Sequence, residues 1–315
     1  MSPHERATRE EPADEHASST PADNAAASDT IHARRVLVQV VLPVVCALVI
    51  LASLVFAPAA ERSQICWASL TAAAAGFAAT SIGVYGGVLV PGLLLMGVDP
   101  RFAAAASLFL QLLVIPLGAG AHLRLGNVRR HVAVPLIACG MLGAFAGPFC
   151  AATLHKETLA RAVASVIVLV GLLVLATLKL GGLASTRPTE TVSRARIGGV
   201  GLVAGFASGI SGAGWGPIGV KLLILLRIDP RQAIGSSLLG RVFMSAAAVA
   251  AYLVSAHAFE GIVPDPWLIA PLIAGSLATM IPGVYLVHRI ERQRAVVFIT
   301  LLSIGLALPV LIRGH

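Results

Sequence analysis

Long runs of apolar residues separated by short polar stretches constrain this sequence more than any other feature. After a first run at 36–57, they cover roughly 66–98, 102–121, 132–153, 159–180, 197–226, 232–256, 267–287 and 295–312. About twenty helical residues cross the hydrocarbon core of a bilayer, whereas a barrel strand needs only about ten alternating ones. Only 12% of the residues are charged, against about a quarter in soluble domains. The sequence therefore predicts an all-α, multi-pass protein of a bacterial inner (plasma) membrane.

The charged and metal-binding residue types argue against several functions. The net charge of +8 fits basic loops at the membrane surface, because no basic stripe with interleaved aromatics suggests a nucleic-acid partner. The four cysteines lack metal-ligand spacing, and no Gly-x-x-x-x-Gly-Lys-Ser/Thr sequence indicates ATP binding. The histidines lie in the tail, in loops or at segment ends. We expect no metal, no cofactor and no enzymatic activity.

The chain divides into five parts by composition. Residues 1–30 are rich in acidic residues, Ala, Ser, Thr and Pro, which predicts a disordered tail. Residues 31–60 contain one extra transmembrane helix. Its end at Ala57-Pro58-Ala59 resembles a signal-peptidase site, but the run is longer than the usual 7–15 residues, which favours a retained helix. Residues 65–180 and 197–312 form two similar halves, joined by a polar linker at 181–196.

The two halves repeat one pattern at an offset of about 130–136 residues. The matching landmarks are Ala75-Gly76-Phe77-Ala78 with Ala204-Gly205-Phe206-Ala207, Asp99-Pro100-Arg101 with Asp229-Pro230-Arg231, Ser107-Leu108 with Ser237-Leu238, and Pro135-Leu136-Ile137-Ala138 with Pro271-Leu272-Ile273-Ala274. Register is kept across all four landmarks. We infer a duplicated unit of four segments, preceded by the extra helix.

Each half opens with a Gly-rich break inside its first apolar segment. The breaks are Ser81-Ile82-Gly83-Val84-Tyr85-Gly86-Gly87 and Ser208-Gly209-Ile210-Ser211-Gly212-Ala213-Gly214-Trp215-Gly216-Pro217. Such clusters weaken a helix, and freed backbone groups survive in lipid only where protein or water receives them. Close helix packing through glycine is the alternative interpretation. Because the breaks occupy corresponding positions, they point to the binding site of a transporter.

The distribution of positive charge favours re-entrant breaks. If every run crossed once, Arg and Lys would be nearly balanced between the two sides of the membrane. If the broken segments are hairpins, most positive charges gather on one side, and the other side keeps only Arg62, Arg101, Lys156, Arg161 and Arg313. The second arrangement obeys the positive-inside rule and makes the halves inverted repeats. The length of each broken segment then suits two helices of about 14 residues.

Several polar side chains lie inside the apolar runs. Arg241 stands near the middle of its run, and its counterpart in the first half is Gln111. No carboxylate occupies the middle of any run, so this buried cation suits an anionic ligand. Lys221 also lies within a run, although it is near enough to an end to snorkel toward the surface.

Serines accompany both mid-run positions. Ser107 lies four residues before Gln111, and Ser237, beside Ser236, lies four residues before Arg241, so each such pair shares a helix face. Their hydroxyls are candidate donors to an oxyanion. Singly, a membrane serine more often bonds a carbonyl of its own helix. We interpret Asp99-Pro100 and Asp229-Pro230 as helix caps rather than as site residues.

The sequence resembles the sulfite exporter TauE/SafE family, also called the toluene sulfonate uptake permease family. The resemblance rests on the two breaks and on the Asp-Pro-x-x-Ala-x-x-x-Ser-Leu stretches that follow them, and it spans roughly residues 65–312. It implies a duplicated permease for sulfite, organosulfonates and related small anions. The chain departs from the family pattern in its extra front helix, in Lys221 where a proline is expected, and in fewer glycines at the first break.

These observations predict a permease for a small, sulfur-containing oxyanion. The partners expected are the anion and the lipid bilayer, with a homodimer as an open possibility. An anion channel and an intramembrane enzyme are the alternatives. The candidate substrate-binding residues lie at the breaks and at the mid-run positions: Ser81, Gly83, Tyr85, Gly86, Ser107, Gln111, Ser211, Gly212, Gly214, Trp215, Lys221, Ser236, Ser237 and Arg241.

Overall fold

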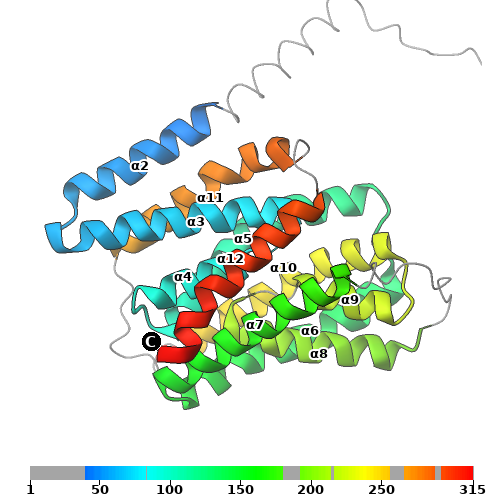
Figure 1. Ribbon diagram of the computed structural model, residues 1–315. Helices are drawn as coiled ribbons and strands as arrows, with labels where there is room; N and C mark the ends of the chain where they lie inside the picture. Colours follow the sequence, from blue (N-terminus) through cyan, green and yellow to red (C-terminus); the bar gives the residue numbers. More distant parts are fainter. Residues whose placement is uncertain are drawn as a thin grey trace, which may run out of the picture.

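Helices account for all the regular secondary structure in the part of the chain that the structure describes. This computed structural model describes residues 40–82, 84–179, 192–213, 216–255, 266–287 and 292–314. The elements are α2 (Leu42–Phe56), the short 3₁₀ helix η2 (Ala59–Glu61), α3 (Arg62–Ile82), α4 (Gly86–Leu95), α5 (Pro100–Arg124), α6 (Arg130–Thr153), α7 (Lys156–Lys179), α8 (Arg194–Ser211), α9 (Gly216–Leu225), α10 (Pro230–Val254), α11 (Pro266–Val287) and α12 (Arg292–Arg313) (Figure 1). The predicted tail, the start of the extra helix and most of the linker lie outside the described residues.

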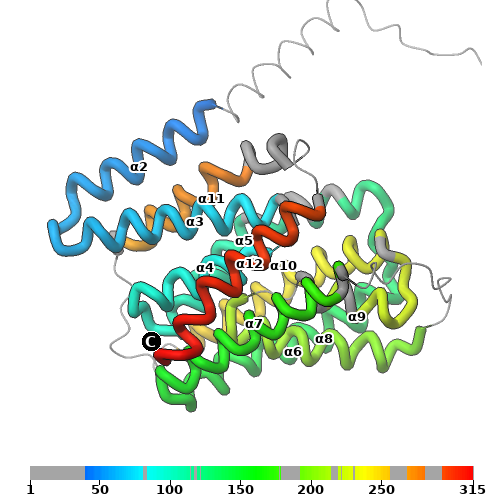
Figure 2. The backbone as a smooth tube through the Cα atoms, viewed as in Figure 1, coloured from blue at the N-terminus to red at the C-terminus, as the bar shows by residue number. Residues whose placement is uncertain are grey.

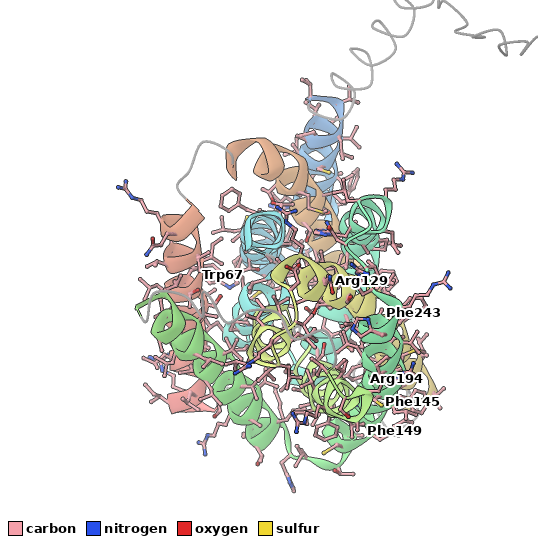
Figure 3. The ribbon with its side chains drawn as sticks, turned by 90° about the vertical axis from the view of Figure 1, so that its right-hand side faces the viewer. Trp67, Arg129, Phe145, Phe149, Arg194 and Phe243 are labelled. Carbon is pink, nitrogen blue, oxygen red and sulfur yellow. The ribbon has the colours of Figure 1, made fainter. Side chains whose placement is uncertain are left out.

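Several helices are long and apolar enough to cross a membrane, as the sequence predicts. Within the described residues they are Arg130–Thr153, Lys156–Ala176, Arg231–Val254 and Gln293–Arg313. Large apolar side chains cover the outside of these helices. Phe145 and Phe149 of α6, whose ring centroids lie 5.3 Å apart, and Phe243 of α10 are each about two-fifths exposed (Figure 3). Such a surface suits lipid, and the chain is a multi-pass membrane protein.

Two aspartates cap the central helices, which confirms the structural interpretation of the Asp-Pro pairs. The Asp99 side chain accepts a hydrogen bond from the backbone N–H of Arg101 over 2.8 Å, at the start of α5. Asp229 accepts one from the N–H of Arg231 over 2.9 Å, at the start of α10. Each carboxylate satisfies a backbone donor that the first helical turn leaves free, and the following proline fits that turn.

The first broken segment folds back on itself. After α3 ends at Ile82, α4 returns beside it, so that Gly92 lies against Thr71. The indole Nε1 of Trp67, near the start of α3, donates to the carbonyl oxygen of Gly92 over 3.0 Å. The C-terminal part of α4 therefore lies beside the N-terminal part of α3.

The two broken segments are divided unevenly, which differs from the expected pairs of helices of about 14 residues. The first comprises α3 with 21 residues and α4 with 10, and the second comprises α8 with 18 and α9 with 10. The helix of α8 continues through Gly209, which packs against the backbone of Ala144 in α6. Close packing therefore explains that glycine, and the break begins only at Gly212.

The helices pack in pairs around a central pair. α3 packs against α11 and α6 packs against α8, on opposite sides of the bundle in Figure 1. α5 and α10 pass between these two pairs, as the trace in Figure 2 shows, and contact each other. α7 packs against α12, and α2 packs against α11. This arrangement brings the mid-helix residues of α5 and α10 together in the interior.

Candidate functional site

Arg241 lies in the centre of the bundle, on the face of α10 that meets α5. Only 5% of its surface is exposed. Its guanidinium Nη2 donates a hydrogen bond to the side-chain Oε1 of Gln111 over 2.8 Å. The two mid-run residues that the sequence singles out are thus in direct contact.

Gln111 and Ser107 of α5 form hydrogen bonds with the second break. The Gln111 amide nitrogen Nε2 donates to the carbonyl oxygen of Gly212 over 3.1 Å and lies 3.2 Å from Ser107 Oγ. Ser107 Oγ also donates to the Gly212 carbonyl, over 2.7 Å. The Gly212 carbonyl, at the end of α8, therefore has two side-chain donors from the facing helix.

Gly212 holds a conformation that other residues rarely adopt. Its φ of +59° is left-handed, and it caps the end of α8 through its N–H, which donates to the carbonyl of Ser208 over 2.8 Å. A Cβ at Gly212 would overlap the backbone of Ala104 in α5. The residue thus lets α8 end against α5 with its carbonyl directed at Ser107 and Gln111.

The first break meets the second at Gly86. A Cβ on Gly86, the first residue of α4, would overlap the Gly212 carbonyl oxygen and would lie 2.6 Å from Ser107 Oγ. Gly86 and Gly212 are 126 positions apart in the sequence, yet their backbones lie against each other at the site. Both breaks therefore converge on the polar cluster around Gln111 and Arg241.

Ser236 and Ser237 of α10 are buried about one turn of the helix before Arg241. Their exposed fractions are 0% and 1%, and neither hydroxyl has a hydrogen-bond partner among the residues that the structure describes. Ser237 lies one helical turn before Arg241, and the two side chains share a face of α10. We call the group formed by Ser107, Gln111, Gly212, Ser236, Ser237 and Arg241 the central polar cluster.

The charge of the central polar cluster is positive. In the described part of the chain, no Asp or Glu side chain is buried, whereas Arg241 is. Gln111, which accepts a hydrogen bond from Arg241, is neutral. An arginine stays charged under ordinary conditions, and a charge in a low-dielectric interior is costly unless a counter-charge or polar groups stabilise it. The cluster is therefore suited to an anion.

Other predicted site residues lie elsewhere or are not described. The hydroxyl of Tyr85 is 2.6 Å from Ser276 Oγ of α11, and Ser211 Oγ donates to the carbonyl of Ala207 over 2.6 Å, as a serine bonded to its own helix does. Both side chains are buried, but neither of these hydrogen bonds involves Arg241 or Gln111. Gly83, Gly214 and Trp215 lie outside the described part of the chain. The side chains of Ser81 and Lys221 are not described either.

A partly open cavity adjoins the second break. Its wall is mostly apolar and includes Val170 of α7 and Ile299 of α12, with hydroxyls from Ser208, Ser211 and Ser303. Ser211 and Ala213 belong both to this wall and to the stretch around Gly212, so the cavity lies beside the central polar cluster. The sequence analysis does not identify it, because apolar residues of a transmembrane helix carry no signal that separates a cavity wall from a lipid-facing surface.

Comparison with known families places the chain in one of them. Residues 68–308, most of the chain, match the family described as sulfite exporter TauE/SafE. The chain belongs to the sulfite exporter TauE/SafE family. The resemblance noted from the two breaks is thereby confirmed, and this TauE/SafE member is a membrane transporter protein by family.

A curated relative supports the same assignment. The "Probable membrane transporter protein YtnM" of Bacillus subtilis (strain 168) is 25% identical over 221 residues, which cover 68% of this chain and 71% of the relative. No solved structure matches the chain significantly. The central polar cluster lies within the matched range, because Ser107, Gln111, Gly212 and Arg241 all fall between residues 68 and 308.

Proposed function

We propose that this protein is a permease that moves a small oxyanion, sulfur-containing and of the sulfite or organosulfonate class, across the bacterial inner membrane. The observation that carries the proposal is the burial of Arg241 against Gln111 near the point where the two helix breaks meet, with the buried Ser236 and Ser237 on the same helix as Arg241. The substrate is bound at the central polar cluster and the protein acts as a carrier.

The chemistry of the cluster suits an oxyanion. A guanidinium presents several N–H donors in a planar fork, which matches two oxygens of a sulfite or sulfonate group. The neighbouring hydroxyls donate to the remaining oxygens. A buried net positive charge with few competing acceptors selects against cations, since these would meet repulsion in a low-dielectric interior.

The packing supports inverted repeats. In the repeat alignment, Gly76 corresponds to Gly205, and Ser276 corresponds to Gly140. Gly76 of α3 packs against the backbone of Ser276 in α11, and Gly205 of α8 packs against the backbone of Gly140 in α6. The first helix of each half thus packs against the third long helix of the other half. Reciprocal contacts of this kind are what a two-fold axis between the halves produces.

Contacts between equivalent elements support the same axis. α5 contacts α10 and α7 contacts α12, and the members of each pair hold corresponding places in the two halves. Gln111 and Arg241, which also correspond, are hydrogen-bonded. Equivalent residues touch each other only close to a two-fold axis, and transporters with such repeats bind substrate at the repeat interface.

The cavity beside the cluster favours an organosulfonate as one substrate. Its apolar wall can receive the organic substituent while the sulfonate group stays at Arg241. Sulfite has no such substituent and needs only the cluster. Both anions therefore bind at the central polar cluster, and the organosulfonate also fills the cavity beside it.

Flux measurements on proteoliposomes test the proposal. Purified protein should accelerate the entry of radiolabelled sulfite and methanesulfonate, and unlabelled anion inside the vesicles should drive transient accumulation of label by counterflow. Saturable flux with counterflow identifies a carrier. Flux without counterflow would mean an anion channel, and protein-containing vesicles that move neither anion faster than empty ones would refute the proposed function.

A further inference from the structure

Many of the buried serines that the structure describes bond their own helix, whereas Ser236 and Ser237 do not. Hydroxyls at five buried positions donate to the carbonyl four residues earlier over 2.7–2.9 Å: Ser53, Ser69, Ser255, Ser276 and Ser303. This is the usual arrangement for serine in a membrane helix. The hydroxyls of Ser236 and Ser237 have no hydrogen-bond partner among the described residues, although both side chains are buried. A buried hydroxyl without a partner is destabilising, so these two positions need an explanation.

The equivalent serine of the first half has a hydrogen-bond partner within the protein. Ser107 corresponds to Ser237, and its hydroxyl donates to the Gly212 carbonyl over 2.7 Å. Gln111 accepts from Arg241 through Oε1 and donates through Nε2 to Gly212, so both ends of its amide are engaged within the protein. The polar groups of α5 thus serve the protein itself, whereas two hydroxyls of α10 are available to a ligand.

We propose that the oxyanion is bound on one side of the central polar cluster, by the hydroxyls of Ser236 and Ser237 together with Arg241. Ser107 and Gln111 are positioning residues, which hold the second break and orient the guanidinium. This inference rests on the proposed function and goes further, since it assigns direct contact to α10 and support to α5. Hydroxyl donors to a charged oxygen form short, strong hydrogen bonds, which offset the burial of the two serines when the anion is present.

The two roles predict opposite effects on the protein without ligand. Ser237→Ala removes a hydroxyl that lacks a partner, so the ligand-free protein should melt at a higher temperature than wild type. Ser107→Ala breaks the hydrogen bond to Gly212, so the ligand-free protein should melt at a lower temperature. Ser236→Ala should behave like Ser237→Ala. Stabilisation by removal of a binding group is a known trade-off at functional sites.

The binding measurement completes the test. Calorimetric titration of the purified full-length variants with sulfite and with methanesulfonate should show that Ser237→Ala weakens affinity roughly tenfold, the value of about one charge-assisted hydrogen bond. Ser237→Cys, which keeps the volume but is a weaker donor, should weaken it too. Ser69→Ala, which alters a buried serine bonded to its own helix in α3, is the control and should bind as wild type.

Distinct results overturn the two proposals. The one-sided assignment is wrong if Ser237→Ala lowers the melting temperature as Ser107→Ala is expected to do. It is also wrong if Ser236→Ala and Ser237→Ala both keep wild-type affinity while Arg241→Gln loses it. In either case the permease proposal stands. If wild-type protein binds neither anion, the proposed function fails and this inference fails with it.

Discussion

Gln111 and Arg241, 130 positions apart in the sequence, are joined by a 2.8 Å hydrogen bond in the centre of the bundle. The neutral amide stabilises the buried guanidinium without cancelling its charge. The same amide donates to Gly212, so the position of Arg241 is linked to the second helix break. A ligand that binds Arg241 therefore acts on groups that also hold the break in place.

Gly212→Ala should destabilise the protein and reduce transport. A left-handed φ costs an ordinary residue about 1–2 kcal/mol, and the new Cβ would also overlap the backbone of Ala104. The matched control is Gly199→Ala in α8, the helix that Gly212 caps, because a Cβ at Gly199 would meet nothing within 4 Å. Thermal melting and sulfite flux of both variants check this. Equal melting temperatures for the two variants would show that Gly212 does not need its left-handed conformation.

The return of α4 beside α3 predicts the topology of the first half. If the broken segment is a hairpin, Asp99 lies on the external side and the central linker at Pro188, outside the described residues, lies in the cytoplasm. Reporter fusions at the two positions should give opposite signals with this assignment. A cytoplasmic Asp99 would contradict the inverted-repeat arrangement, because it would require the broken segment to cross the membrane.

Val170→Phe should separate the two substrate types. Val170 lines the cavity, so the phenyl ring of the new phenylalanine would occupy space that an organic substituent needs. We expect transport of p-toluenesulfonate to fall about tenfold or more, a loss of about 1.4 kcal/mol, while sulfite transport stays close to wild type. Leu169→Phe is the control, because Leu169 is 69% exposed on the outer face of α7. Equal losses for both anions would mean that the cavity does not take the organic group.

Much of the fold follows from hydrophobicity and helix-end signals. Runs of apolar residues locate α5, α6, α7, α10, α11 and α12, and the Asp-Pro pairs mark where α5 and α10 begin, since a carboxylate and a proline suit the first helical turn. The lengths of the helices at the breaks are less predictable. Glycine permits both close packing and a chain break, and only the contact of Gly209 with Ala144 distinguishes it from Gly212.

The candidate site was predictable in part, because charge in a membrane segment is costly. That principle singles out Arg241 and its counterpart Gln111, whose contact the structure then provides. The different uses of Ser107 and Ser237 were not predictable, since both are serines four residues before the mid-helix position. Which hydroxyl finds a carbonyl depends on the facing helix, where Gly212 approaches Ser107.

Arg241→Gln tests the central claim most directly, through sulfite binding by calorimetry and sulfite flux in proteoliposomes. The change makes the two halves alike at this position and removes the buried positive charge. We predict a folded protein that loses about 2 kcal/mol or more of binding free energy, roughly thirtyfold in affinity, with a smaller but measurable loss for Arg241→Lys. Arg124→Gln, which removes an exposed arginine at the end of α5, should bind and transport as wild type. If Arg241→Gln binds and transports sulfite like wild type, the anion site lies elsewhere, and Lys221 becomes the next residue to test.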